Sequence, residues 1–501
     1  MLEITGDYLS IKDIVKVSRK YEPIKLSPYA KERIMEGYLN LQKGKSKNPK
    51  IYGMSTGVGS MKDIFIPFLE REQYQKNILL SHAIGTGSYF DEEVVRAAIL
   101  LKVNSFAKGC SGVRLLVVES LIALLNNNIV PAVPQKGSVG SSGDLVPLAY
   151  IALVIIGEGY VIEKNQIVSS KSILQSHKLY PISLVEKEGL SLINGTEIMT
   201  AIASLVCYDA DVLFKTADIA GAMSFEVLNG VIDAYNLDAM NVRPHTGQLV
   251  VAQNFLSLLK GSFLEKEEQA STQDAYSLRC IPQVHGASRD ALTHVINIVT
   301  TEINSVTDNP IFINNCVISN GNFHGQPIAL VMDYLKIALS EMGNISERRI
   351  NRMLDCNLSH LPAFLTTNLQ TSPGLMIVQY SAAALVSEDK VLAHPASVDS
   401  IPLSANQEDH VSMGTIAARQ AKEILINVQN VIAMELFVSI NGIEFLKHEL
   451  GKGTQLTYDY LRQVSPQIEE DRLYIDDIKK ITHVVASGEL LEEVMKVIKV
   501  L

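Results

Sequence analysis

The chain has 501 residues, of which 47% are hydrophobic and 20% are charged, and its formal net charge is −10. This composition is that of a globular protein with a large core rather than that of a disordered chain. Phosphate backbones and anionic surfaces are bound through clustered Lys and Arg, so the acidic balance argues against nucleic acid or a membrane as a partner.

The N-terminal segment and the cysteines bear on location. The first residues, MLEITGDYLSIKD, carry acidic side chains where a secretory signal has basic ones followed by an apolar core, so we expect no export signal. The five cysteines are scattered, form no CxxC pair and have no histidines at metal-ligand spacing, so no metal site is predicted. These features favour a cytoplasmic protein.

Helical periodicity dominates the chain. Asp91 can cap a helix that Gly109 ends, and Ser111 can cap the next helix, which runs through Leu125. The apolar run 145–157 is too short to span a bilayer and predicts a buried helix. Further long helices are expected over 199–228, 247–259, 287–306, 326–353 and 410–446.

Strand signals are few and short. They fall at 129–133, at 160–162 with Ile167, and at 311–318, which reads as a hairpin. Several long helices lack a polar face and must be buried by other helices, including those of other subunits. The expected fold is therefore mainly α. A large bundle of long helices over 201–501 follows a small α/β N-terminal region over 1–200, with no linker between them.

A glycine- and serine-rich stretch, KGSVGSSGDL, occupies residues 136–145. Its glycines have neither the spacing of a dinucleotide-binding fingerprint nor that of a Walker loop. Neither serine stands midway between glycines as in a nucleophile elbow, which makes a serine hydrolase the weakest interpretation. Taken alone, the stretch predicts a turn.

The longer run GSVGSSGDLVPLA, residues 137–149, resembles the signature of the aromatic amino acid ammonia-lyases. In that family an Ala-Ser-Gly tripeptide cyclises, with loss of two waters, to methylidene-imidazolone (MIO). The resemblance implies an ammonia-lyase/fumarase-like fold and autocatalytic MIO formation from Ser141, Ser142 and Gly143, with no diffusible cofactor. Ser141 stands where alanine is commonest. Glycine suits position 143 because it has no Cβ to obstruct ring closure.

Three further segments resemble parts of the same family's site. IYGMSTGVG (51–59) matches a mobile inner loop in which Tyr52 is the base that removes the β-proton. NILLSHA (77–83) matches the segment that contacts the substrate ring and places His82 there. SLINGT (191–196) gives Asn194 as an orienting group beside MIO. Without the resemblance, these residues read as turn or core residues.

Two more segments match family motifs further along the chain. QDAYSLRCIPQ (273–283) supplies Arg279 for a bidentate grip on the substrate carboxylate, Tyr276 close to MIO, and Gln273 as a further polar contact. GNFHG (321–325) brings Phe323 to the site. On its own, Arg279 reads as a structural ion-pair partner.

The segment SANQEDHVSM (404–413) bears on the substrate. Its Gln-Glu-Asp-His run resembles the histidine-specific members of the family. The Glu408 carboxylate and the His82 imidazole can hydrogen-bond the two nitrogens of a substrate imidazole, whereas a phenyl ring leaves both unpaired. The resemblance therefore implies elimination of ammonia from L-histidine to give urocanate.

The family also implies a homotetramer in which three subunits contribute to each site. Three alternatives remain open. A tyrosine ammonia-lyase and an aromatic aminomutase both fit, because His82 also suits a phenol and loop closure is not visible in a sequence. The third is an uncyclised, inactive scaffold, if Ser141 blocks ring formation.

Overall fold

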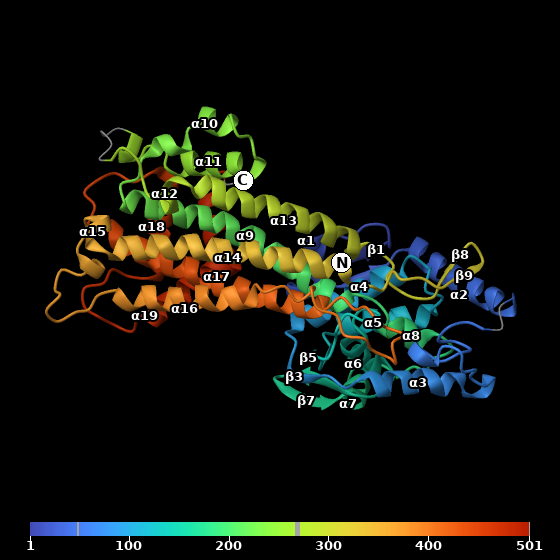
Figure 1. The fold of residues 1–501 in the computed structure, drawn as a ribbon. Coiled ribbons are helices and arrows are strands. Elements are labelled where there is room, and N and C mark those ends of the chain that lie inside the picture. The colour runs from blue at the N-terminus through green and yellow to red at the C-terminus, as the bar shows by residue number, and fades with distance from the viewer. Residues whose placement is uncertain (48–49, 266–270, 500–501) are drawn as a thin grey trace. The chain divides into compact units, whose positions relative to one another are not determined.

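The structure, a computed structural model, describes residues 1–47, 50–265 and 271–499 (Figure 1). Helices dominate and the strands are short, which confirms the expected mainly α fold. The chain divides into two compact units. Unit 1 comprises Met1–Tyr208, Ile296–Asp333 and Pro395–Arg419, and unit 2 comprises Asp209–Val295, Tyr334–His394 and Gln420–Leu501.

Unit 1 combines short helices with four small sheets. Its helices are α1 Ile11–Arg19, α2 Pro28–Lys47, α3 Arg71–His82, α4 Glu92–Phe106, α5 Leu115–Asn126, α6 Leu145–Ile155, α7 Ser170–Ser176 and α8 Glu188–Ile193. Two sheets are the parallel pair β1 Leu2–Ile4 with β2 Ile24–Leu26 and the antiparallel pair β3 Thr86–Tyr89 with β5 Pro134–Lys136. The others are β4 Val130–Pro131 with β6 Tyr160–Glu163 and β7 Gln166–Ser169, and the hairpin β8 Ile311–Ile313 with β9 Cys316–Ile318.

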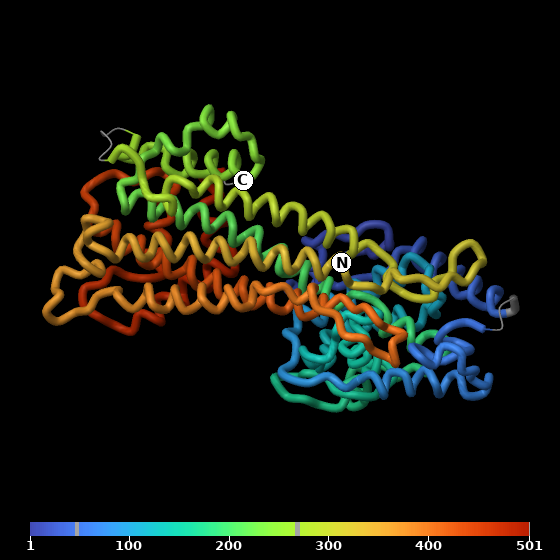
Figure 2. Tube along the Cα trace, in the orientation of Figure 1, coloured from blue at the N-terminus to red at the C-terminus, as the bar shows by residue number. Residues whose placement is uncertain are grey.

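The core of unit 1 is built around α4. This helix is buried from Val94 to Phe106 and packs against α1 and α5. Its N-cap residue is Asp91, as the sequence predicts. In Figure 2 the segments 296–333 and 395–419, coloured yellow and orange, run back among the blue and teal elements of this unit. The late segments therefore lie beside the N-terminal region.

The long helices are α9 Glu197–Val227, α13 Ile281–Ile303, α14 Gln326–Leu354 and α17 Gly414–Ile443. Unit 2 also contains α10 Leu237–Asn241, α11 Thr246–Leu258, α12 Tyr276–Arg279, α15 Cys356–Ser359, α16 Met376–Leu392, α18 Lys452–Val464, α19 Tyr474–Ser487 and α20 Glu489–Met495. α17 is long and apolar enough to cross a membrane by composition, but 83% of its most apolar window is buried inside the protein. Such burial is typical of a helix in a bundle core.

A buried ion pair joins the bundle helices within unit 2. Arg349 of α14 donates to both carboxylate oxygens of Glu435 in α17, at 2.5 and 2.8 Å, and both side chains are fully buried. Ser224 of α9 and Ser346 of α14 donate to the same carboxylate at 2.6 Å. Each of these hydrogen bonds forms only when its two residues lie at the same level along the bundle. Together they therefore favour one axial alignment of α9, α14 and α17.

Three helix starts differ from the sequence-based predictions by three residues or more. The expected cap at Ser111 is wrong, because α5 begins at Leu115 with Arg114 as its N-cap. α13 starts at Ile281 rather than 287, since Pro282 lies in the first turn, where no backbone N–H is required. α17 starts at Gly414 rather than 410, because Met413 has a φ of +56° and its N–H bonds the carbonyl of Val139 at 2.9 Å.

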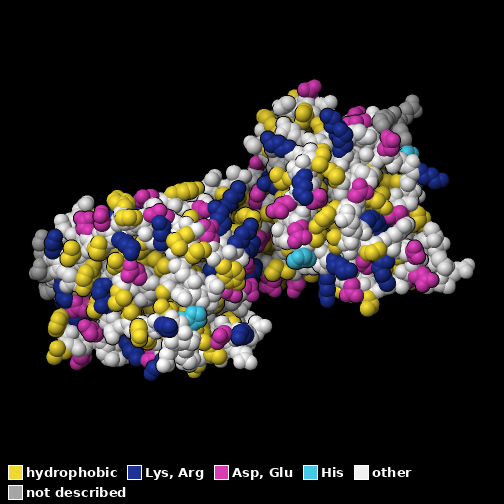
Figure 3. Space-filling view, turned by 180° about the vertical axis from the view of Figure 1, so that it is seen from behind, with side chains coloured by type: hydrophobic (Ala, Val, Ile, Leu, Met, Phe, Trp, Pro, Cys, Tyr) yellow, Lys and Arg dark blue, Asp and Glu magenta, His cyan; other side chains and the backbone are white. Residues whose placement is uncertain are grey.

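On the face shown in Figure 3, acidic and basic side chains are interspersed among hydrophobic ones in both units.

Candidate active site

The glycine-serine loop lies between β5 and α6 and is fixed against the segment that precedes α9. Gly195 N donates to the Ser142 carbonyl at 3.1 Å, and Asp144 N donates to the Gly195 carbonyl at 2.7 Å. Ser142 and Gly143 have φ values of +47° and +75°. A Cβ on Gly143 would overlap the backbone of Gly195, so position 143 accepts only glycine.

The buried carboxylate of Asp144 fixes the glycine-serine loop through hydrogen bonds. It is fully buried and accepts hydrogen bonds from Met199 N at 2.9 Å, from Ser138 Oγ at 3.1 Å and from Thr415 Oγ1. Burial raises the pKa of Asp144 to about 6, although these donors oppose the rise. Sequence analysis did not single out this residue, because an aspartate before an apolar helix reads as an ordinary cap.

Glu408 lies in the segment between α16 and α17, and its side chain contacts the glycine-serine loop. Leu403 and Glu408 form an antiparallel bridge around three residues, 404–406, with positive φ. The Glu408 carboxylate accepts a hydrogen bond from Ser141 Oγ. Ser60 N donates to Ser404 Oγ at 3.0 Å, so the inner loop carrying Tyr52 is bound to the same segment.

Tyr52 is half-buried in that inner loop. Its Oη accepts a hydrogen bond from Gly59 N at 2.8 Å. Burial raises the pKa of Tyr52, the Gly59 N–H opposes the rise, and the negative charge of Glu408 adds to it. The Gly59 N–H would stabilise a phenolate at this oxygen, whereas burial and Glu408 favour the neutral phenol, so Tyr52 must lose its proton before it can accept one.

His82 lies at the C-terminal end of α3 with one tautomer favoured. Its Nδ1 is 2.7 Å from the carbonyl of Ile78, and a carbonyl only accepts, so Nδ1 carries the proton and Nε2 is an acceptor. Burial lowers the pKa of His82, which keeps the ring neutral, while Ile78 and Glu408 oppose this. The negative charge of Glu408 contributes to the pKa of both His82 and Tyr52.

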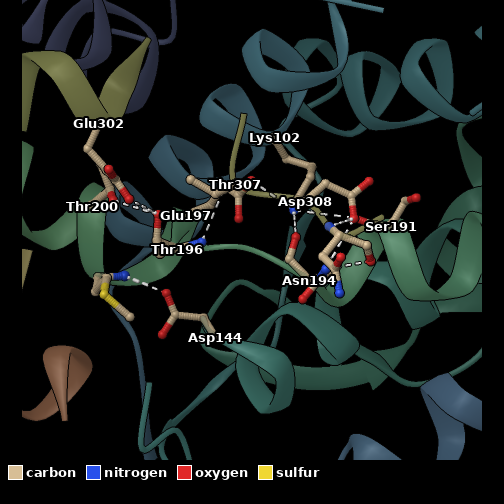
Figure 4. A network of polar contacts seen from close by, with 12 residues as sticks. Lys102, Asp144, Ser191, Asn194, Thr196, Glu197, Thr200, Glu302, Thr307 and Asp308 are labelled. Carbon is tan, nitrogen blue, oxygen red and sulfur yellow. Dashed lines mark hydrogen bonds and ion pairs between the residues drawn. The ribbon is translucent and has the colours of Figure 1, made fainter. Parts of the chain in front are cut away.

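Asn194 belongs to a buried polar network (Figure 4). Its amide nitrogen donates to Asp308 Oδ1 at 3.2 Å and to the carbonyl of Asn309 at 3.0 Å. Lys187 pairs with Asp308 at 2.7 Å, and Lys102 donates to the Asn194 carbonyl at 2.8 Å. Both amide hydrogens of Asn194 are therefore engaged, so its Oδ1 is oriented as an acceptor.

Phe323 is half-buried in the turn before α14, also in unit 1. The next residue, His324, stacks on His410 with ring centroids 5.6 Å apart. His324 Nε2 also lies 3.2 Å from the carbonyl of His410. The turn that carries Phe323 is thus tied to the segment that carries Glu408.

Gln273, Tyr276 and Arg279 lie in unit 2. Tyr276 is 71% exposed at the start of α12, and the Arg279 guanidinium lies over its ring, 4.7 Å from the centroid. Neighbouring Asp274 is held by Val231 N at 2.6 Å. The half-buried Arg279 guanidinium and the exposed Tyr276 ring thus form a basic and aromatic pair within their unit.

The predicted residues thus fall into two groups. Unit 1 carries the glycine-serine loop, a tyrosine, a histidine, a carboxylate, an amide and a phenyl ring, namely Ser141, Ser142, Gly143, Tyr52, His82, Glu408, Asn194 and Phe323. Unit 2 carries a cation that can bind a carboxylate, with Arg279 beside Tyr276 and Gln273. The residues that sequence reasoning missed are the buried charges that hold the first group, namely Asp144, Lys102, Lys187 and Asp308.

The chain is similar to known proteins over nearly its full length. The model of the family "Aromatic amino acid lyase" matches residues 9–463. The histidine ammonia-lyase of Alkaliphilus oremlandii is 48% identical over 500 residues, which cover 99% of each chain. The solved structure of histidine ammonia-lyase from Trypanosoma cruzi has a TM-score of 0.92 at 39% identity, with 99% of this chain and 95% of that chain covered. Tyrosine aminomutase from Streptomyces globisporus has a TM-score of 0.95 at 33% identity, with 100% of both chains covered.

Proposed function

The chain belongs to the aromatic amino acid lyase family, and we propose that it acts as a histidine ammonia-lyase, which eliminates ammonia from L-histidine to give urocanate. The observation that carries this proposal is the hydrogen bond that places the Glu408 carboxylate at Ser141, in a chain 48% identical to a histidine ammonia-lyase. Lyases and aminomutases share this fold, so structural similarity does not decide between the two reactions. The substrate assignment depends on the side chains of His82 and Glu408.

We infer that Ser141, Ser142 and Gly143 cyclise to MIO. A bond forms between Gly143 N and the carbonyl carbon of Ser141. One water carries away that carbonyl oxygen with the amide hydrogens of Gly143 and Ser142, which leaves a double bond from the Ser141 carbon to Ser142 N, and a second carries away the Ser142 hydroxyl with its α-hydrogen. The residues present suit the ring, because positive φ at 142 and 143 already bends the chain and Gly143 has no Cβ. When formed, MIO supplies an electrophile that makes the substrate amine a leaving group.

Tyr52 Oη is proposed to take the β-proton of the substrate. The phenolate that this requires is stabilised by the Gly59 N–H, whereas burial and Glu408 disfavour it. Asn194 Oδ1, held as an acceptor, is suited to receive a hydrogen from the substrate ammonium group. Arg279 is proposed to bind the substrate carboxylate, with Tyr276 and Gln273 as polar contacts.

His82 and Glu408 are proposed to recognise the substrate ring. His82 Nε2 and the Glu408 carboxylate are both acceptors, so together they suit a protonated imidazole ring, which offers two N–H donors. A phenyl ring offers none and leaves the half-buried His82 without a donor. A phenol offers one O–H, so L-tyrosine is the second candidate substrate, supported also by the similarity to a tyrosine aminomutase.

The decisive experiment mixes purified protein with L-histidine and follows the ultraviolet absorbance of urocanate, with ammonia measured in the same sample. Urocanate and ammonia in equal amounts are expected, together with an intact mass that is two waters lower than the sequence mass. L-Tyrosine and L-phenylalanine are assayed in parallel, and β-amino acid products are sought by chromatography. Conversion of tyrosine alone, a β-amino acid product or an unchanged mass would contradict the proposal.

We also propose a cytoplasmic homotetramer. Apolar side chains remain exposed on α16 of unit 2, where Ile377, Tyr380 and Val391 are 56%, 61% and 73% exposed. Contacts between subunits would bury such side chains, in keeping with the family's arrangement. Light scattering coupled to gel filtration should give four times the chain mass, and a fully active monomer would contradict this assembly.

A further inference from the structure

Ser141 departs from the alanine that is common at the first position of the cyclising tripeptide, and its side chain makes a contact that alanine cannot make. Its Oγ donates a hydrogen bond to Glu408 Oε2. Ser141 is 8% exposed, so water competes only weakly for this bond.

Glu408 benefits from such a contact because its own segment does not fix its carboxylate. The Leu403–Glu408 bridge and the bond from Ser60 N to Ser404 Oγ hold the backbone. Beyond that backbone, the Glu408 side chain still rotates about its own bonds. A hydrogen bond to one carboxylate oxygen reduces this freedom before a ligand binds.

Ring closure leaves this donor in place. The closure proposed above uses the carbonyl group of Ser141 and the hydroxyl group of Ser142, so Ser141 keeps its Oγ. The carboxylate of Glu408 then has one oxygen engaged by Ser141 and a second oxygen that can accept an N–H from a substrate ring.

We infer that Ser141 is a specificity-determining positioning residue, whose hydroxyl orients Glu408 so that the carboxylate recognises a ring N–H of the substrate. This inference rests on the proposed function, because it takes Glu408 as the group that recognises the ring. It gives Ser141 no part in proton or ammonia transfer. Loss of the hydroxyl should therefore weaken ring recognition more than it slows turnover.

The first test is Ser141→Ala, after intact mass has established that the variant has also lost two waters. KM for L-histidine and the inhibition constant of urocanate should rise about three- to tenfold, with a smaller change in kcat. Inhibition by cinnamate, which has the same carboxylate but no ring N–H, should be unchanged. Ser141→Thr keeps a hydroxyl and should restore urocanate binding, and Ser172→Ala, at an exposed serine of α7, is the matched control.

A double-mutant cycle with Glu408→Gln then separates positioning from general structural damage. If Ser141 acts through Glu408, Ser141→Ala should add no further loss of urocanate binding in the Glu408→Gln background. Additive losses, or equal weakening of urocanate and cinnamate, would overturn the inference. If the wild-type protein converts tyrosine and not histidine, the proposed function fails. The same cycle with p-coumarate against cinnamate then decides whether Ser141 positions Glu408 toward a phenol O–H.

Discussion

Gly143 and Gly195 lie side by side as a parallel bridge, and the backbone of Gly195 is too close for residue 143 to carry a side chain. This contact joins the loop proposed to cyclise to the segment that presents Asn194. A change in the backbone at Gly195 would therefore affect both the loop proposed to form MIO and the position of Asn194. The first prediction follows from this contact.

Gly195→Ala should impair ring formation although residue 195 supplies no ring atom. Its φ is +134°, and an added Cβ would overlap the carboxylate of Glu197. A side chain is strained at this φ, and a shift of the backbone at 195 would disturb its hydrogen bond to the Ser142 carbonyl, so we expect intact mass to show incomplete loss of two waters, with activity lowered in proportion. Gly261→Ala is the control, because Gly261 has a φ of +86° and its Cβ would meet nothing within 4 Å. Backbone strain of about 1–2 kcal/mol is expected there, without loss of activity. Full maturation of Gly195→Ala would contradict the prediction.

Tyr52→Phe should lower kcat by about 10²- to 10⁴-fold, the usual contribution of a general base, while the intact mass still shows ring formation. Tyr74→Phe is the matched control. Tyr74 Oη accepts from Val58 N at 3.2 Å in the same loop, and its loss should reduce kcat far less. Equal effects of the two substitutions would indicate that the loop needs both phenols for its structure and would contradict a base at Tyr52.

The pH dependence of kcat/KM should reflect the ionisation of Tyr52. The active form of a base is the deprotonated one, and burial and Glu408 raise the pKa of Tyr52 above its usual value of 10.0. Values of kcat/KM should therefore still be rising with pH in the alkaline range. Glu408→Gln removes the negative charge, so the rise should begin at lower pH. An unchanged profile in that variant would mean that Glu408 does not act on the catalytic base.

Much of this arrangement could be predicted from local patterns. The hairpin at 311–318, the long helices and each loop of the candidate site carry local signals of period or turn chemistry. The bond from Ser141 to Glu408 could not be predicted, because it joins residues far apart in sequence. The start of α17 was misplaced for the same reason, since Met413 leaves helical geometry in order to bond Val139. Buried charges such as Lys187 and Asp308 give no sequence signal, because each looks like a surface residue until its partner is known.

The Lys187–Asp308 pair is predicted to orient Asn194 rather than to stabilise the fold. Asp308→Leu alone should destabilise the protein by about 3–5 kcal/mol, since it leaves Lys187 buried without a counter-charge. Adding Lys187→Met should recover most of the melting temperature. Activity should stay low in the double variant, because the amide of Asn194 has lost an acceptor. A stable double variant with wild-type kcat would show that Asn194 does not depend on Asp308.

Asp389 of α16 is predicted to make stability fall as pH rises. It is 1% exposed, accepts a hydrogen bond from Asn427 Nδ2 at 2.8 Å, and lies near Glu388 and Glu423. Burial raises its pKa to about 7. Between the unfolded value of 3.8 and this value, the folded chain binds the proton and the unfolded chain does not, so raising the pH through this window favours unfolding.

Asp389→Asn keeps an acceptor for Asn427 without the charge. Its melting temperature should exceed that of the wild type by a margin that is small at about pH 4, grows toward pH 7 and is constant above it. Asp459→Asn, at an exposed aspartate of α18, should show no such margin, and a constant difference across the range for Asp389→Asn would mean that the pKa of Asp389 is not raised in the folded protein.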